Sequence, residues 1–254
     1  MGMLGILVPE EYGGAWPGYV RIRPRHRGAL ARGRPRSGLR SPRTTRSAPD
    51  HIFTFGSEDS SAASYVPTLA AGKRSAPGRL TEPTAGSDAA GTTTTAVRDG
   101  NDWVLNGSKT FTTHGSVGDI AVVFAVTDKS EGKHGIIAFV VEKGMKGFRP
   151  ARRRTSSAAA PRDTAEVDHG GLPRPGRATR SGTDGEGFVD AMKILDGGRI
   201  SIAALALGMA QGAYEAALAY AEERRQFGQP IAEFQAIQFI PGRHGDARST
   251  PRVS

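Results

Sequence analysis

Residues 80–88 read Leu-Thr-Glu-Pro-Thr-Ala-Gly-Ser-Asp, and they lead through four consecutive threonines, 92–95, into a run of alternating strand residues. Pro83 and Gly86 favour a turn here over a helix or the interior of a strand. A turn with many backbone N–H groups and short hydroxyls suits a phosphate or the polar edge of a ring, although an ordinary solvated loop has the same composition. The stretch is therefore a candidate binding loop at the entrance to a β region.

The residues after this loop predict an antiparallel β domain. Two strand-like runs, 103–105 and 108–113, flank Asn106-Gly107, a dipeptide typical of a type I′ hairpin turn. Residues 119–127 and 135–142 are two further strands, dense in Val, Ile, Phe and Ala, with a polar connection between them.

Helices are predicted on both sides of the β region. Residues 187–226 have apolar and small residues at three- or four-residue steps, which predicts a long helix with one packed face. Residues 226–230 predict a loop, and 232–240 the beginning of another helix. His51, near the other end, has no second histidine at metal-ligand spacing, so we expect a structural role for it.

Composition excludes several classes of protein. The 254-residue chain has no cysteine, which excludes disulfides, zinc thiolate sites and thiol catalysis. No run approaches the roughly eighteen apolar residues of a membrane span, and the first ten residues lack the features of a secretory signal.

The net charge of +9 comes from three arginine-rich stretches, residues 21–46, 149–180 and 241–254. They hold 21 of the 27 arginines, no lysine and four acids, so they sum to +17 and the rest of the chain to −8. Nucleic-acid surfaces usually mix Lys with Arg and interleave aromatic residues, whereas these stretches combine Arg with Pro, Ala, Gly and Ser without periodicity. A non-enzymatic basic protein that binds nucleic acid stays an alternative, and the distribution argues against it.

The loop at 80–88 resembles the flavin- and substrate-contacting loop of the acyl-CoA dehydrogenase family. Four more blocks resemble family motifs, in family order: residues 9–14, 103–113, 196–199 and 224–228. The short-chain (butyryl-like) branch is the most similar, from residues 135–148 and 224–238. The resemblance implies an α+β multidomain fold with a helical N-terminal domain, an antiparallel β middle domain and a helical C-terminal domain.

The resemblance divides this chain into three domains, each interrupted. A remnant of the helical N-terminal domain covers 1–72, with 17–49 expected to be disordered. The β middle domain covers 73–183, and the aberrant residues 149–183 are expected to remove strands that close it. A truncated helical C-terminal domain covers 184–254, and its residues 241–254 are aberrant.

The aberrant stretches suggest out-of-frame translation joined to in-frame blocks, because the resemblance stops and resumes abruptly at their edges. Residues 73–79 depart from the family in the same way. Disordered basic linkers are the structural alternative. A mitochondrial transit peptide is a rival for the first stretch, but that stretch is internal and its prolines break an amphipathic helix.

The resemblance implies FAD as cofactor and an acyl-CoA thioester as substrate. The residues implied for FAD are Leu80, Thr81, Ser87, Phe111, Thr113, Arg224, Gln226, Phe227 and Gln235. Those implied for the acyl-CoA are Ser87, Asp196 and Arg199. Without the resemblance, Phe111 is a plain strand aromatic, Asp196 and Arg199 a surface ion pair, and Arg224 a solvated helix end.

The catalytic glutamate of the family has no counterpart here. Most members place it in the C-terminal helical half, beyond the resemblance, and a minority place it where this chain has Gly198. Without a base, proton abstraction loses most of its catalysis, so we expect an inactive chain or an inactive FAD- and acyl-CoA-binding fragment.

The resemblance also implies a setting for the protein. An intact member is expected to be a homotetramer that passes electrons to an electron-transferring flavoprotein, without nucleic acid or membrane partners. The expected compartment is the bacterial cytoplasm or, as a second choice, the mitochondrial matrix.

Overall fold

The structure is a computed structural model. It describes residues 8–14, 47–56, 63–115, 118–145, 148–154, 164–175, 180–181 and 185–239. The chain divides into two compact units, Met1–Pro17 with Pro42–Gly198 and Gly18–Ser41 with Arg199–Ser254, and each is described by itself. The arginine-rich stretches 21–46 and 241–254 lie outside the described residues.

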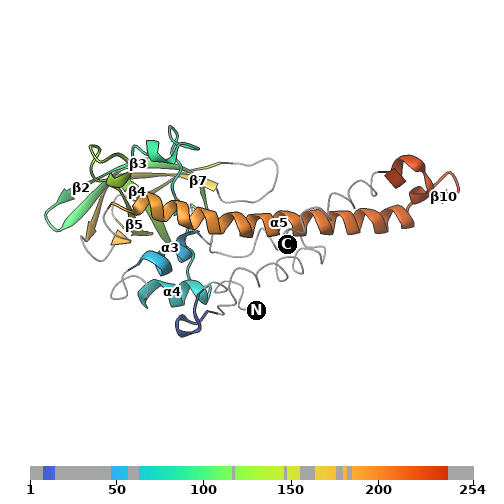
Figure 1. Cartoon of the computed structure of the whole chain (residues 1–254), viewed down its shortest axis with the longest axis horizontal. Helices are drawn as coiled ribbons and strands as arrows, with labels where there is room; N and C mark the ends of the chain where they lie inside the picture. The colour runs from blue at the N-terminus through green and yellow to red at the C-terminus, as the bar shows by residue number, and fades with distance from the viewer. Residues whose placement is uncertain are drawn as a thin grey trace. The chain divides into compact units, whose positions relative to one another are not determined.

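The first unit is built on one eight-stranded sheet of order β6-β7-β3-β2-β4-β5-β8, with β1 paired to β4 (Figure 1). The strands are β1 Gly78–Arg79, β2 Thr95–Asp99, β3 Asp102–Thr113, β4 Ile120–Val126, β5 Ile136–Glu142, β6 Phe148–Arg154, β7 Thr164–Pro175 and β8 Arg180–Ser181. Most neighbours are antiparallel, but β1 and β2 each run parallel to β4. The predicted antiparallel domain is therefore a mixed sheet.

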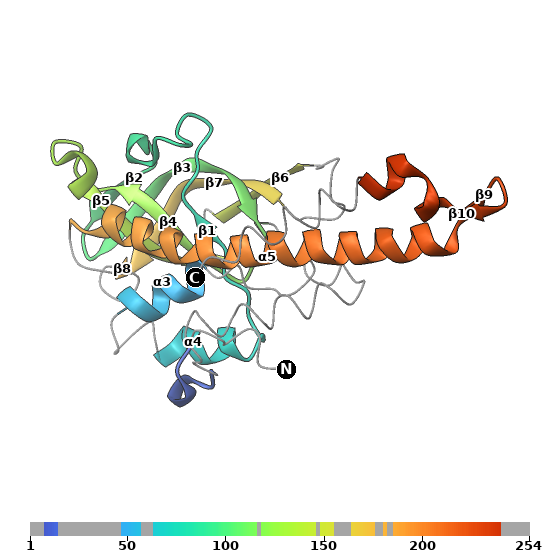
Figure 2. The ribbon, with the colours of Figure 1, turned by 45° about the vertical axis from the view of Figure 1, so that its right-hand side comes forward.

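Strands β4 and β5 form the centre of the core, because both are nearly continuous apolar runs. All seven residues of β4 are buried, and it pairs with β5 over its whole length. The face with Val122 packs against helices α3 (Ser47–Phe55), α4 (Ala63–Ala70) and the start of α5 (Figure 2). The face with Val123 packs against Leu105 of β3. The two strands predicted at 119–127 and 135–142 are confirmed.

The hairpin predicted from 103–105 and 108–113 is wrong, because both runs lie in the single strand β3, which forms a hairpin with β2 instead. Strands β2 and β3 pair from Thr95↔Asn106 to Asp99↔Asp102, so the turn lies at Gly100-Asn101, where Gly100 has a φ of 60°. Asn106-Gly107 lies inside β3. A Cβ at Gly107 would come within 2.4 Å of the Thr94 hydroxyl oxygen, so this glycine permits close approach of β2 and not a turn.

The described residues of the stretch 149–183, namely 149–154, 164–175 and 180–181, form strands, so the expectation that this stretch removes strands is wrong for them. Within this stretch β6 pairs with β7, β7 with β3 and β8 with β5. Every residue except proline offers a backbone N–H and C=O to these ladders, whatever its side chain, and β3 is twelve residues long. The long strand β3 therefore supplies a full-length partner for β7 even where the sequence is rich in arginine and proline.

The helices agree in large part with the expectations. The predicted long helix is α5, Gly187–Glu223, and it continues through Gly197 and Gly198. The turn η1 (Glu10–Tyr12), α3 and α4 are helical, as the N-terminal remnant predicts. Of the segment 17–49, residues 17–46 lie outside the described part, and 47–49 begin α3, so the expected disorder is wrong there. The three domain boundaries stay a prediction.

In the second unit, the predicted loop after α5 is a small hairpin. Strand β9 (Arg225–Gln226) pairs with β10 (Gln229–Pro230), and a 3-10 turn, η6 (Ile231–Glu233), follows. Residues 235–239 are helical, which confirms most of the helix predicted at 232–240. Within the described parts of the chain, no helix has the length and apolar character needed to cross a membrane.

Candidate functional site

The loop at 80–88 is a turn, as predicted, and it is attached to β3. Glu82 and Ala85 exchange backbone hydrogen bonds, the Glu82 N–H donating to Ala85 at 2.9 Å and the Ala85 N–H to Glu82 at 3.4 Å. The Thr110 N–H of β3 donates to the Thr81 carbonyl oxygen at 2.8 Å. Leu80 and Thr81 are half-buried, whereas Ser87 is exposed. The base of the loop is therefore fixed against β3, and its far end faces solvent.

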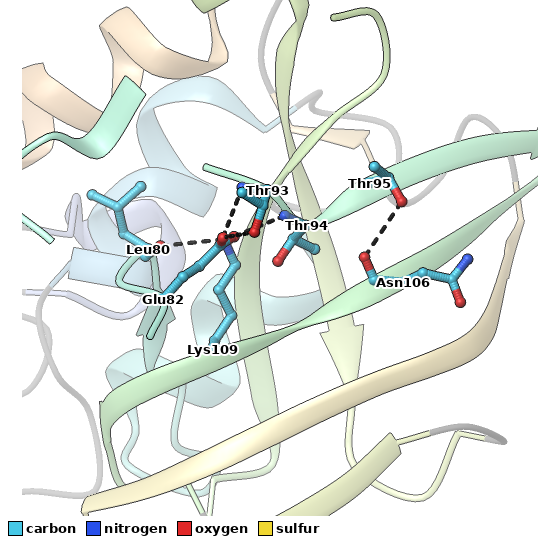
Figure 3. Close-up of polar contacts among 7 residues, drawn as sticks. All are labelled: Leu80, Glu82, Thr93, Thr94, Thr95, Asn106 and Lys109. Carbon is cyan, nitrogen blue, oxygen red and sulfur yellow. Dashed lines mark hydrogen bonds and ion pairs between the residues drawn. The ribbon is translucent and has the colours of Figure 1, made fainter. Parts of the chain in front are cut away.

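A buried ion pair lies beneath this loop (Figure 3). Lys109 Nζ of β3 donates to Glu82 Oε1 at 2.7 Å and to the Leu80 carbonyl oxygen at 3.2 Å. The other Glu82 oxygen accepts from the Thr93 N–H at 2.7 Å and the Thr93 hydroxyl at 2.6 Å, and Oε1 accepts from the Thr94 N–H at 3.0 Å. The side chains of Lys109 and Glu82 are only 0% and 1% exposed.

The Glu82 carboxylate is charged at neutral pH. Burial alone would raise the pKa of Glu82, but the hydrogen bonds from Lys109, Thr93 and Thr94 outweigh it and bring the pKa to about 2. Burial lowers the pKa of Lys109 from its ordinary value, and the hydrogen bond and negative charge of Glu82 oppose that shift. The carboxylate therefore stays ionised well below neutral pH and holds the ammonium beside it.

Two residues beyond Lys109, strand β3 is irregular. The register with β7 shifts between Lys109 and Thr112, and Phe111 has a φ of 53°. Thr110 and Thr112 on either side are buried, whereas Phe111 is 61% exposed. A non-glycine residue in the left-handed region costs about 1–3 kcal/mol and is typical of functional sites. The bulge therefore leaves the aromatic ring of Phe111 largely exposed to solvent.

The arrangement fits a flat ring system such as a flavin. Phe111 offers an exposed aromatic face for stacking, and the half-buried Thr113 places a hydroxyl two residues farther along the strand. Leu80 and Thr81 are held to the same strand through Lys109 and Thr110. Four of the residues predicted for FAD, Leu80, Thr81, Phe111 and Thr113, are thus brought together by two adjoining segments.

Ser87 lies at the exposed end of the same loop, and the remaining predicted FAD residues lie in the second unit. The Arg224 N–H donates to the Tyr220 carbonyl oxygen at 2.8 Å, which ends α5, and the β9–β10 hairpin follows. Phe227 and Gly228 form its tip with φ values of 52° and 84°, the combination of a type I′ turn. Phe227 is 94% exposed and meets Phe234 edge-on, with centroids 6.2 Å apart. It is a second exposed aromatic residue with a positive φ.

The hairpin also contains polar groups suited to a dinucleotide. The side chains of Arg224, Arg225 and Gln226 are exposed, and the Gln226 amide donates to the Arg225 carbonyl oxygen at 2.7 Å. Gln235 lies in the short helix that follows η6. A guanidinium with free access to solvent can bind phosphate oxygens through two parallel hydrogen bonds.

The predicted substrate residues occupy α5 and the loop. Asp196 and Arg199 are exposed and lie three positions apart on the same helix, so their side chains share one face. Gly198 between them is half-buried, and a Cβ built there meets no atom within 4 Å. The helix therefore has room for a longer side chain at the position where some family members place their base.

Sequence reasoning missed Glu82 and Lys109 as parts of the site. Glu82 was quoted only as part of the loop, and Lys109 only as part of a strand. One signal in the sequence could have indicated Lys109. It stands at a position of β3 that shares a face with the buried Leu105, where a charged side chain needs a partner. The structural role predicted for His51 is confirmed, because it packs edge-on against Phe124 in the core and burial lowers its pKa to about 4.

Comparison with known families gives two matches. Residues 79–169 match the family described as "Acyl-CoA dehydrogenase, middle domain", and residues 185–241 match "Acyl-CoA dehydrogenase, C-terminal domain". The first match includes the candidate loop, Lys109 and Phe111, and the second includes α5 and the β9–β10 hairpin. The middle-domain match also runs through part of the second arginine-rich stretch.

Individual relatives agree with these matches. An acyl-CoA dehydrogenase of Bacillus subtilis (strain 168) is 40% identical over 94% of this chain and 62% of its own length. A short-chain specific acyl-CoA dehydrogenase of Megasphaera elsdenii is 43% identical over 74% of this chain and 49% of its own length. The chain thus spans about three fifths or less of these curated relatives.

Solved structures show the same fold. The butyryl-CoA dehydrogenase of Megasphaera elsdenii has a TM-score of 0.87 at 33% identity, over 99% of this chain and 66% of that one. A structure titled for the electron transferring flavoprotein of Acidaminococcus fermentans has a TM-score of 0.91 at 40% identity, over 99% of this chain and 65% of that one.

Proposed function

Because the chain belongs to the acyl-CoA dehydrogenase family and carries its middle and C-terminal domains, we propose that it binds FAD and an acyl-CoA thioester. The observation that carries this proposal is Phe111, which is exposed, has a backbone in the left-handed region and lies in the strand to which the loop at 80–88 is hydrogen-bonded. Backbone strain of this kind costs free energy, and it is explained if the strained conformation presents the Phe111 ring to a bound ring.

Each residue of the site has a proposed task. Phe111 stacks near the flavin ring, while Leu80, Thr81 and Thr113 hydrogen-bond its polar edge through backbone and hydroxyl groups. Arg224, Gln226, Phe227 and Gln235 form a second FAD contact surface, which in an oligomer would reach the FAD of a neighbouring subunit. Arginine suits the pyrophosphate because of its planar fork of donors.

The substrate side involves Ser87, Asp196 and Arg199. Ser87 lies at the exposed end of the loop, where it can meet both the flavin phosphates and the CoA arm. Asp196 and Arg199 border the CoA tail from one face of α5. A short- or medium-chain acyl group is proposed, since relatives named for short-chain and butyryl-CoA dehydrogenases are among the matches.

When bound, FAD supplies the hydride acceptor for removal of two hydrogens from the acyl chain. The protein must supply the base that takes the α proton, and we propose that this chain does not. Position 198, to which the resemblance assigns the base of some members, is glycine. Binding without turnover is the expected behaviour.

The partners follow from the same relatives. We propose an electron-transferring flavoprotein as the redox partner of an intact member, in line with the Acidaminococcus structure, and a homotetramer as its assembly. The bacterial cytoplasm is the proposed compartment, because the relatives from Bacillus and Megasphaera are bacterial.

Addition of butyryl-CoA to the FAD-loaded chain tests substrate binding and inactivity together. The account predicts a saturable change in the flavin absorbance band without bleaching. Bleaching of the band, or dye reduction with any acyl-CoA, would show that a base is present. If neither butyryl-CoA nor longer thioesters change the flavin spectrum, the proposal that the chain binds an acyl-CoA is wrong.

A further inference from the structure

The ion pair between Lys109 and Glu82 is poorly explained by stability alone. Each buried charge loses several kcal/mol of hydration, and apolar residues of similar volume often replace a buried pair at no net cost. Here both side chains are at most 1% exposed, and the compensation comes from their mutual attraction and the hydrogen bonds around them. A reason beyond packing is therefore needed for two charges at this place.

The hydrogen bonds connect three separate segments. Lys109 on β3 donates to two oxygens of the loop, the Leu80 carbonyl and Glu82 Oε1. The Glu82 carboxylate in turn accepts from Thr93 and from the Thr94 N–H, at the beginning of β2. One carboxylate and one ammonium thus fix the loop, the start of β2 and the middle of β3 to one another.

The pair also lies next to the proposed ring-binding residues. Lys109 precedes Phe111 by two positions and Thr113 by four, and it bonds directly to the carbonyl of Leu80. The Thr110 N–H also joins this part of β3 to the loop, by donating to the Thr81 carbonyl oxygen. The spacing between the two sides of the site therefore depends on Lys109 and Glu82.

We propose that Lys109 and Glu82 are positioning residues of the FAD site, whose ion pair holds Leu80 and Thr81 in register with Phe111 and Thr113. This inference rests on the proposed function, since it assigns the pair a task toward FAD. Neither residue touches the ring in this account. Their effect is to pre-form the site, so that FAD binding does not have to order the loop.

The test uses three variants of the full chain. The double variant Glu82→Gln with Lys109→Met removes both charges, and the glutamine keeps one acceptor oxygen, which can serve the Thr93 N–H and hydroxyl. Glu82→Asp keeps the charge but shortens the arm by one methylene, which alters the spacing. Lys133→Met removes an exposed lysine far from the pair and is the matched control.

FAD affinity is measured by flavin fluorescence titration, and the folded state of each apoprotein by thermal unfolding. We expect the double variant to melt near the wild-type temperature but to bind FAD at least tenfold more weakly, about 1.4 kcal/mol. Its visible flavin band should lose fine structure, because the ring is less rigidly held. Glu82→Asp should also bind FAD more weakly, and Lys133→Met should match the wild type.

Two different results would overturn the inference: one refutes only the positioning role, and the other refutes FAD binding itself. If the wild type binds FAD and both the double variant and Glu82→Asp bind it with unchanged affinity and spectrum, the pair is structural only. If the double variant does not fold, Glu82→Asp alone decides: wild-type FAD affinity in that variant would also show that the pair is structural only. If the wild type itself takes up no FAD, the proposed function fails first and the positioning role fails with it.

Discussion

Substitution of Gly198 by glutamate should convert a binding protein into a catalyst. Gly198 is half-buried within α5, and a Cβ there meets no atom within 4 Å, so the new side chain can be accommodated. It would place a carboxylate at a position that part of the family uses for its base. A positioned general base contributes about 10²–10⁴-fold, so turnover should rise at least about a hundredfold above the wild type.

The same change has a calculable effect on stability. Glycine inside a helix costs about 0.5–1 kcal/mol relative to a good helix former, and glutamate is one. The unfolding free energy should therefore rise by that amount, which for a protein of this size is about 1–4 °C in the melting temperature. Gly198→Gln should give the same rise, because its side chain has the same shape and similar helix propensity.

The glutamine variant therefore separates chemistry from folding. Both variants are loaded with FAD and assayed with butyryl-CoA and an artificial electron acceptor, and both are melted without ligands. Turnover by Gly198→Glu alone supports the account. Turnover by the wild type, a gain in Gly198→Gln, or no gain in Gly198→Glu despite bound FAD and thioester would refute the reasoning.

Two further predictions concern the buried His51 and the strained Phe111. Burial lowers the pKa of His51 from 6.5 to about 4, so the folded state should lose about 3 kcal/mol as the pH falls from 6.5 to 4. Urea unfolding across that range should show the loss, and His51→Leu should abolish most of it. Phe111→Ala should weaken FAD binding by about threefold to tenfold in a fluorescence titration yet change stability by less than about 0.5 kcal/mol, since its ring is exposed; unchanged FAD affinity would count against stacking.

The central strands and the long helix could be predicted from the sequence, because their signals are local. Strand β4 is apolar throughout, and α5 repeats its apolar residues at helical spacing. The binding loop was equally clear, since Pro83 and Gly86 exclude regular structure there. In each case the residues themselves contain the reason for the conformation.

Features that depend on distant contacts could not be predicted. Asn106-Gly107 has the sequence of a tight turn, but Gly107 is required by the close approach of Thr94, and Gly100 makes the turn instead. Strands β6, β7 and β8 depend on pairing with β7, β3 and β5, respectively, and not on their own composition. The pair of Lys109 and Glu82 joins residues 27 positions apart, and no local pattern indicates it.

Titration of the purified apoprotein with FAD tests the central claim most directly, because every proposed role depends on a flavin pocket in this chain. The account predicts saturable quenching of flavin fluorescence and a yellow protein that retains FAD through gel filtration. A chain that is folded, stays colourless and leaves added FAD free, above all one that binds DNA in a salt-sensitive manner, would contradict it.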